Sequence, residues 1–572
     1  MTRFHVPKTI VIYSLLLVLC GAGYAKYDSY QLDGDAVAFM DIADAIRAHD
    51  IAHMVNGYWN PGYPAMLLAG ELIKQPTRWN ELQVFYWVNF FIFVACIFAC
   101  LYFVSALLRF RNDLDKHSER PPALSGLAMF LVALALLFAS FQRELSLGAI
   151  RSDSLLLCLF IVAGGFVFRL QSRAGFAYYP LLGFVLGLAY LTKSFALLPS
   201  IILLASIAVF GLTRKSSERR TMLLGILVAD LAFSAIAGPY ILAISKQRSR
   251  FTTGESARLN YAFFVDHTSR WHEWHSGDLG KAKADFKHHE QLLIPSPPVY
   301  SYAMHPVGTY PLWFDPAYWT DTIHPAFYLR WQVARLARNC VLLLRFLLGH
   351  LEGFVVLGVL VITGCSFGRR RDTWLPLVPV SAWGLIMIGI YFPVDFQDRY
   401  LTGALFLFVI PLLAMLRRSS GSEVANGIAM MLAGLVLADG VRTIAELRRV
   451  ESVNGAARGA YNREIYSAAS GLREVGVLPG ELVACFGGTA CYVDQYWARV
   501  AHTPIRAEIE APGDIDPGEF WKSLANQEQV LEVLRRQNIR AVVAVFAPSS
   551  HVPDGWQELG SSHFYAMRVN DK

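Results

Sequence analysis

Charged side chains are scarce in this sequence. Only 17% of its 572 residues are Asp, Glu, Lys or Arg, while 54% are hydrophobic. Soluble domains carry about 25% charged residues, so this composition excludes an ordinary soluble protein and indicates a membrane protein. The net charge of +6 is also small for this length. The basic residues fall in short clusters between apolar segments, which fits membrane orientation and argues against a nucleic acid as partner.

Cysteine is scarce as well, and eight residues are too few for a disulfide scaffold. Cys485 and Cys491 enclose the segment CFGGTAC, whose two glycines allow a tight loop closed by a disulfide in a compartment that permits one. Two unrelated thiols are the alternative. The other six lie in apolar stretches and are typical of small core residues: Cys20, Cys96, Cys100, Cys158, Cys340 and Cys365.

Long apolar runs, by contrast, are abundant. A membrane span needs roughly 20 mostly apolar residues. The sequence predicts about eleven such helices, at residues 6–25, 84–108, 124–141, 154–170, 178–191, 196–213, 222–244, 340–364, 374–392, 400–416 and 425–441. A signal peptide is the alternative interpretation of the first run.

The polar connections between these runs alternate in character. Five of them are rich in Arg and Lys: residues 109–120, 169–175, 214–220, 368–371 and 417–423. All five lie on one side if the N-terminus is cytoplasmic and every candidate spans, and the cytoplasmic side collects such charges. We therefore expect a multi-pass protein of a bacterial-type inner membrane, with the remaining connections on the extracytoplasmic side.

The domain organisation follows from this topology. Residues 1–444 are predicted to form the transmembrane domain, including the external loops 26–83 and 245–336. Residues 445–572 have a soluble composition, and we expect a small extracytoplasmic α/β domain there. Within it LVACF, IRAVVAVFA and HFYAMRV are predicted strands, and GEFWKSLANQEQVLEVLRRQN is a predicted amphipathic helix.

Residues 30–50 place five aspartates at the predicted outer surface. Asp35 is followed by AVAFMDIADAIRAHD, whose apolar residues form one stripe, as in a short helix lying on the membrane. Asp33 and Asp35 would then precede this helix, where its dipole favours carboxylates. Asp41 is assigned to its polar face. N-capping, a purely structural role, is the alternative interpretation of the first two.

Further charges are predicted at the same surface. Lys193 lies between two apolar helices in GLAYLTKSFALLPS, and there it needs an anionic partner or the water interface. Contact with a phosphate is one interpretation, and snorkelling to water is the other. The turn PVDFQDRY (393–400) adds Arg399 with two aspartates. The segment 141–157 adds Arg143, Arg151, Glu144 and Asp153.

Four motifs in chain order resemble the family C glycosyltransferases. These membrane enzymes have the GT-C fold and take a sugar from a polyprenyl-phosphate carrier; the lipid A aminoarabinose transferase and the protein O-mannosyltransferases are members. The motifs are DAVAFMDIA (35–43), NPGYPAMLL (60–68), GLAYLTKSFALLP (187–199) and RYLTGALFLFVIPLL (399–413). The resemblance covers roughly residues 6–416. It departs from the family at Ala36, where the family has a second acidic residue.

The resemblance implies an inverting transfer of a sugar from a polyprenyl phosphate to a lipid-linked glycan, lipopolysaccharide or protein at the outer face. Asp35 would be the general base, with Asp33 as second choice. The donor phosphate would contact Lys193, Arg399, Arg151 and Arg143. The substrate pocket would include Tyr58, Trp59, Asn60, Tyr63 and Tyr400.

No cofactor is expected, and a divalent metal is not favoured because Ala36 replaces the second acid. The histidines of the long external loop also fit no compact zinc pattern: His267, His272, His275, His288 and His289. Two other functions stay open from the sequence. One is a transporter or flippase of lipid-linked sugars, which should carry charges at mid-membrane and repeats or broken helices. The other is a non-catalytic assembly subunit that acts through its tail.

Overall fold

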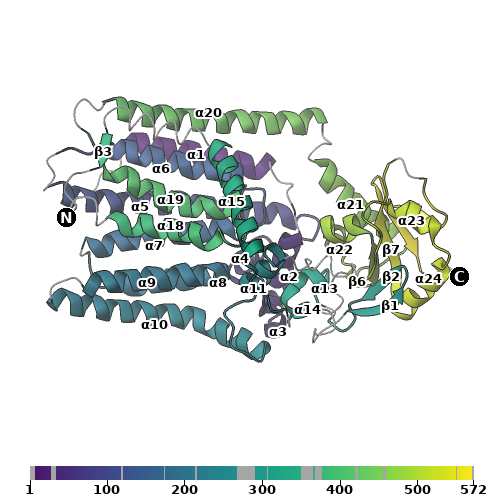
Figure 1. The fold of residues 1–572 in the computed structure, drawn as a ribbon. Helices are drawn as coiled ribbons and strands as arrows, with labels where there is room; N and C mark the ends of the chain where they lie inside the picture. The colour runs from purple at the N-terminus through teal and green to yellow at the C-terminus, as the bar shows by residue number, and fades with distance from the viewer. Residues whose placement is uncertain are drawn as a thin grey trace.

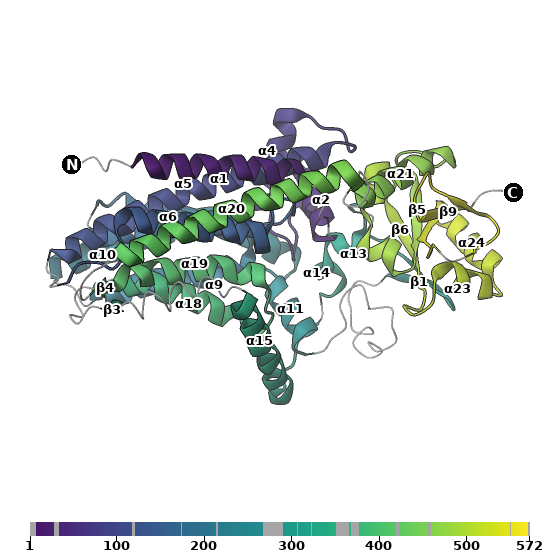
Figure 2. The ribbon, with the colours of Figure 1, turned by 90° about the horizontal axis from the view of Figure 1, so that it is seen from above.

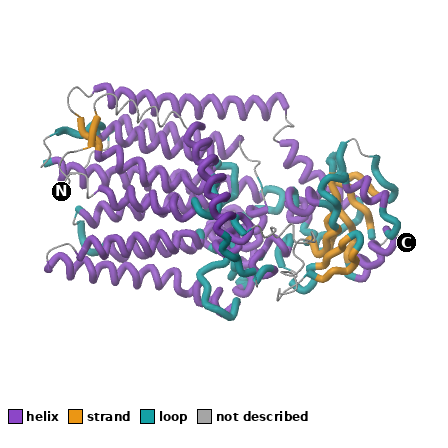
Figure 3. The backbone as a smooth tube through the Cα atoms, viewed as in Figure 1, coloured by secondary structure: helices purple, strands orange, loops and turns teal. Residues whose placement is uncertain are grey.

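The protein consists of a helical bundle with a sheet domain at one end (Figure 1). The computed structural model describes residues 7–27, 32, 34–116, 120–172, 174–212, 216–266, 290–305, 307–321, 323–349, 365–367, 377–418, 423–454, 459–548 and 551–569. Strands gather in the terminal domain. A short antiparallel pair, β3 (Cys365–Phe367) with β4 (Leu416–Arg418), lies at the opposite end of the bundle (Figure 3).

Within the described part of the chain, seven helices are long and apolar enough to cross a membrane. They are α1 (Lys8–Tyr27), α5 (Glu81–Asp115), α6 (Gly126–Ser140) extended by η1 (Phe141–Leu145), α7 (Asp153–Gln171), α10 (Ser216–Gln247), α19 (Asp398–Met415) and α20 (Glu423–Asn454). Three shorter apolar helices accompany them: α8 (Tyr178–Thr192), α9 (Leu197–Leu212) and α18 (Val378–Tyr391). The predicted polytopic helical fold is confirmed, and each predicted span except 340–364 coincides with one of these helices.

The exception involves α15 (Leu329–Gly349), which starts well before the predicted span at residue 340. It leaves the bundle at a steep angle (Figure 2). Its sequence LRWQVARLARNCVLLLRFLLG carries four arginines, and charges of this kind are costly in a lipid-facing helix. Residues 350–364 lie outside the described residues.

Close packing in the bundle depends on small residues. A Cβ at Gly183 of α8 would lie 1.9 Å from the backbone oxygen of Ala229 in α10. Only glycine therefore permits the two helix backbones to approach this closely, as is common in membrane proteins.

The terminal domain is a seven-stranded sheet in the order β1-β2-β6-β5-β7-β9-β8. β5 (Leu482–Phe486), β6 (Ile505–Ile509) and β7 (Ile539–Val545) are parallel, and antiparallel strands flank them: β1 (Gln291–Pro295), β2 (Pro298–Ser301), β8 (Trp556–Glu558) and β9 (Phe564–Arg568). The three predicted strands are β5, β7 and β9. β1 and β2 come from loop 245–336, so two chain segments build the domain.

Helices surround this sheet: α21 (Gly459–Glu474), the π-helix η6 (Thr489–Val493), α22 (Tyr496–Ala501), α23 (Pro517–Ser523) and α24 (Gln527–Arg536). The amphipathic helix predicted across 518–538 is in fact two helices, because Leu524 adopts an extended conformation and ends α23. The predicted domain boundary at residue 445 falls inside α20, which continues to Asn454.

Short helices fill the space between the bundle and the sheet domain (Figure 1). They are α2 (Gly34–Arg47), α3 (Ile51–Met54), α4 (Gly62–Lys74), η2 (Ser194–Ala196), α11 (Ser256–Phe264), α13 (Pro311–Phe314) and α14 (Pro316–Trp319).

The expectation that α2 exposes a polar outer face is wrong. Residues 36–43 of α2 are all buried, and Asp41, assigned to a polar outer face, is only 8% exposed. The apolar stripe packs as expected for an amphipathic helix. The opposite face is covered by the segment around Thr309 and α13 together with α22 of the sheet domain, which no periodicity in α2 reveals.

Candidate active site

Asp35 lies in the first turn of α2, directly after Gly34. A Cβ at Gly34 would lie 2.4 Å from Cε2 of Trp313 and 2.6 Å from Nε2 of Gln495, so the chain needs glycine here. The carboxylate of Asp35 is 24% exposed, and its Oδ2 lies 4.0 Å from Nη2 of Arg399. Asp35 is thus accessible and faces a guanidinium. Asp33 lies outside the described residues.

Lys193 occupies a break between two apolar helices. Its backbone is extended, with φ −156° and ψ 126°, and separates α8 from η2 and α9. Its Nζ donates to Oδ1 of Asp153 at 2.7 Å and lies 4.0 Å from the centre of the Tyr400 ring. The ammonium is therefore held by a carboxylate and an aromatic face, with 23% of the side chain exposed.

Asn60 stabilises this helix break. Its side-chain Nδ2 donates to the backbone oxygen of Tyr190 at 2.8 Å, and its Oδ1 accepts from the backbone nitrogen of Ser194 at 3.1 Å. Both flanks of Lys193 are thereby bonded to one buried side chain. Asn60, predicted as a pocket residue, therefore holds the backbone on both sides of Lys193.

Arg399 is the second residue of α19 and lies between two carboxylates. Its Nε is 3.9 Å from Oδ2 of Asp153, and its Nη2 is 4.0 Å from Oδ2 of Asp35. The Nε also donates to Oε1 of Gln397 at 2.9 Å. Gln397 in turn donates to Asp395, so a hydrogen-bond chain orients the guanidinium from behind.

Aromatic rings form one side of this cluster. Tyr400 stacks on Tyr391 with ring centres 4.7 Å apart, and Tyr391 stacks on Phe195 at 3.8 Å. Tyr58 donates its hydroxyl to Oδ1 of Asn260 at 2.7 Å. Burial, and after it the charge of Asp35, raises the pKa of Tyr58 well above its ordinary value, so this phenol stays a neutral hydrogen-bond donor.

Trp59 and Tyr63 continue the same chain segment away from the charges. Trp59 packs edge-to-face on Tyr58 and on Phe39. Tyr63 is fully buried, packs on Phe39 and donates its hydroxyl to Oδ1 of Asn89 at 2.7 Å. Tyr63 thus lies in the core of the bundle, where the sequence interpretation had expected a pocket residue.

Asp153 is the site residue that the sequence interpretation left without a role. As the first residue of α7, with its side chain 10% exposed, it lies between Lys193 and Arg399. Arg151 also interacts favourably with it. The signal was present, because an acidic residue began a span on the predicted outer side. Arg143 lies in η1 at the end of α6, and its role stays a prediction.

Taken together, Asp35, Asp153, Lys193 and Arg399 form a four-charge cluster whose formal charges cancel. Asp153 and Arg399 lie in the first turns of apolar helices, Lys193 directly follows one, and Asp35 lies in the first turn of α2. An accessible carboxylate, two cations and an aromatic wall in one place have the chemistry to deprotonate a nucleophile while stabilising an anionic leaving group.

A separate cavity of about 320 Å³ lies further along α2. Asp41, Asp44 and His53 line it from one side, and Arg499 and His502 line it from the sheet domain. It is therefore distinct from the four-charge cluster.

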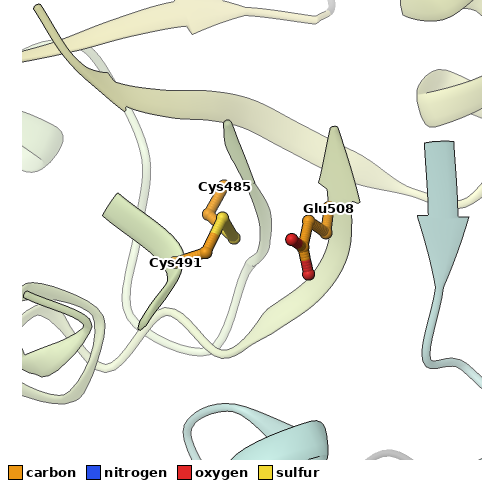
Figure 4. A group of neighbouring side chains, drawn as sticks. All are labelled: Cys485, Cys491 and Glu508. Atoms are coloured by element: carbon orange, nitrogen blue, oxygen red, sulfur yellow. A yellow bond between two sulfur atoms is a disulfide. The ribbon is translucent and has the colours of Figure 1, made fainter. Parts of the chain in front are cut away.

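A possible metal-binding group within the described residues consists of Cys485, Cys491 and Glu508 (Figure 4). The two sulfur atoms are joined in a disulfide, with Cα atoms 5.4 Å apart, so they offer no thiolate. Glu508 instead accepts hydrogen bonds from Tyr302, Tyr310 and Tyr492. This group is a structural part of the sheet domain. The histidine loop considered for zinc lies outside the described residues.

The fold is that of a polytopic helical membrane protein. The four-charge cluster lies at the end of the bundle that faces the α/β domain. No protein-family model matches the chain, and a search of curated proteins finds no match.

Solved structures similar to the chain include ArnT, the aminoarabinose transferase, from Cupriavidus metallidurans. The structure of its apo state matches with 11% sequence identity, and the structure bound to undecaprenyl phosphate matches with 12%. Each match covers 97% of both chains with a TM-score of 0.40. A third is the Archaeoglobus fulgidus oligosaccharyltransferase tethered to an acceptor peptide. It is 12% identical and covers 93% of this chain and 69% of that one, with a TM-score of 0.40. These are GT-C glycosyltransferases, the group that the four sequence motifs resemble.

Proposed function

We propose that this protein transfers a sugar from a polyprenyl-phosphate carrier to an acceptor at the extracytoplasmic face of the inner membrane, with inversion at the anomeric carbon. The observation that carries the proposal is the position of Arg399. It lies about equally far from Asp35, the candidate base, and from Asp153, which also holds Lys193.

The reaction balances within this cluster. The acceptor's oxygen or nitrogen forms a bond to the anomeric carbon, and the bond from that carbon to the phosphate oxygen breaks with its electron pair. The acceptor's proton goes to Asp35, and polyprenyl phosphate leaves. A single displacement of this kind inverts the anomeric centre.

During this step negative charge is lost at Asp35 and gained at the leaving phosphate, and the nearby cations can stabilise that change. Asp35 loses its negative charge as it takes the proton, while the leaving phosphate gains one. Arg399 lies 4.0 Å from Asp35, so its guanidinium can follow the charge from the base to the phosphate. Interactions that strengthen as charge develops lower the barrier. Lys193 supplies a second cation for the leaving phosphate, while its partner Asp153 keeps its charge throughout the step.

The location of the charges argues against a transporter. Lys193 directly follows α8, Asp153 begins α7, and Arg399 is the second residue of α19. Transporters place their coupling charges near the membrane midplane, whereas these belong to the boundary between bundle and outer domain.

A donor-only assay tests the proposal. Purified protein in detergent is incubated with polyprenyl-phosphate sugars of several kinds, and release of polyprenyl phosphate is followed by mass spectrometry. We expect slow release by water as a substitute acceptor, and none with Asp35→Asn. No release with any donor would refute the transferase, whereas equal release by both proteins would keep the transferase and show that Asp35 is not its base. Accumulation of intact donor inside vesicles would point to a transporter.

A further inference from the structure

The sheet domain contacts α2, the helix that carries Asp35, through α22 and the residue before it. Two contacts matter. The amide of Gln495 lies against Gly34 at the start of α2, and the guanidinium of Arg499 reaches carboxylates near the middle of α2. The sheet domain therefore contacts α2 at its first residue and again two to three turns further along, with Asp35 between these contacts.

Arg499 is buried, with 2% of its side chain exposed. Its Nη1 lies 2.7 Å from Oδ1 of Asp41 and 2.8 Å from Oδ2 of Asp44, both on α2. Its Nε and Nη2 donate to the two oxygens of Glu81 on α5, at 2.8 and 3.0 Å. This bidentate geometry uses the planar fork of an arginine, which lysine cannot reproduce.

Other bonds close this network. Arg78 pairs with Asp44 and Glu81 at 2.6 and 2.9 Å. Thr309 donates its backbone N–H and its hydroxyl to Asp41, and Tyr496 donates to Glu81. The network thus joins α2, α5, the 307–309 segment and α22. Because its members are largely buried, solvent and salt screen it little.

The geometry links this network to the proposed base. Asp41 follows Asp35 by six residues, which is about 9 Å along a continuous helix. A hydrogen-bonded helix of this length is rigid, so a shift at Asp41 moves Asp35. We infer that Arg499 is a positioning residue: the outer domain holds α2 in place through it and thereby sets Asp35 against Arg399. This inference rests on the proposed function.

The alternative is a purely structural role, in which the network only attaches the sheet domain to the bundle. The two roles predict different effects of an Arg499 substitution on turnover. Attachment alone leaves turnover unchanged as long as the protein stays folded. Positioning predicts that turnover falls because misplacement by about 1 Å costs about 10²-fold in rate.

The experiment compares Arg499→Met and Arg499→Lys with the control Arg540→Met. Arg540 lies in the same domain, on β7, and pairs with Glu481 at 3.0 Å with half of its side chain exposed. Donor binding, kcat and KM for the donor, and hydrogen exchange of residues 34–47 are measured on the full-length protein. Asp44→Asn, which alters the network from the α2 side, is the second variant in case Arg499→Met does not fold.

We expect kcat to fall about 10²-fold in Arg499→Met, less in Arg499→Lys and Asp44→Asn, and not at all in Arg540→Met. Donor KM should change little, because Lys193 and Arg399 are intact. Exchange of residues 34–47 should rise in the order of the kcat losses. A folded Arg499→Met with normal kcat, or a kcat loss without faster α2 exchange, overturns the inference. If the unmodified protein releases no polyprenyl phosphate, the proposed function fails, and the exchange arm still decides whether Arg499 orders α2.

Discussion

Among single residues, Asp35 offers the sharpest test of chemistry against structure. Asn is nearly the same size as Asp, but it cannot take a proton. Asp35 is the second residue of α2 and does not precede the helix as the sequence had suggested, so the change costs the helix only a charge–dipole interaction of about 0.3–1 kcal/mol. We expect Asp35→Asn to express and unfold normally while turnover falls by about 10²–10⁴-fold, as is usual for loss of a general base. Steady-state turnover and a thermal melt measure the two effects.

Asp33→Asn is the control for this change and should be milder. If instead Asp33→Asn is the inactive variant and Asp35→Asn is active, the base is Asp33. If both stay active, acid–base chemistry by this segment is wrong, and Asp153, Asp395 and Asp398 are the next candidates.

Lys193 and Asp153 are tested as a pair, because removing one leaves the other charge poorly hydrated. Lys193→Met should lower both stability and donor use. Loss of one member of a buried pair costs about 3–5 kcal/mol, and less is expected here since Lys193 is partly exposed. The double variant Lys193→Met with Asp153→Asn should regain stability but not donor use. Thermal melts measure the effect on stability, and donor KM measures the effect on donor use. Normal donor use by Lys193→Met would mean that the lysine only extends to water.

At the scale of the element, the break between α8 and α9 positions Lys193. Asn60→Ala removes both side-chain bonds that support it, leaving a buried carbonyl and N–H unpaired at about 1–3 kcal/mol. We expect lower thermal stability together with weaker donor use. Asn60→Asp keeps the acceptor for Ser194, but it sets a carboxylate oxygen against the Tyr190 carbonyl and adds a charge at a buried site, so we expect it to lose at least as much stability as Asn60→Ala. Lower stability with unchanged donor KM would show that Lys193 does not depend on this support.

For the whole molecule, the topology makes one prediction. The basic connections belong to the cytoplasmic side, so the sheet domain should be outside. A reporter fused after Lys572 that works only outside the cytoplasm should be active. A reporter that works only in the cytoplasm should be silent there. The reverse pattern would place the four-charge cluster on the wrong side for an extracytoplasmic acceptor and would overturn the proposed orientation.

The sequence alone determined the features that depend on neighbours along the chain. Apolar runs long enough to span are visible directly, since hydropathy is a property of a segment. The strands β5, β7 and β9 were predictable from short apolar runs of β-branched and aromatic residues. Asp35, Lys193 and Arg399 stood out because each is a charge beside an apolar segment, and such charges need a reason.

Which of these charges meet depends on packing between distant segments. Lys193 and Asp153 are 40 residues apart, and Arg499 and Asp41 are 458 apart. No local pattern encodes such pairs. For the same reason the sequence could not show that α2 is buried under a second domain, that β1 and β2 leave the 245–336 loop to join the sheet, or that Tyr63 faces the core. Hydropathy reports how much a segment avoids water, but the packing of distant segments determines what covers it.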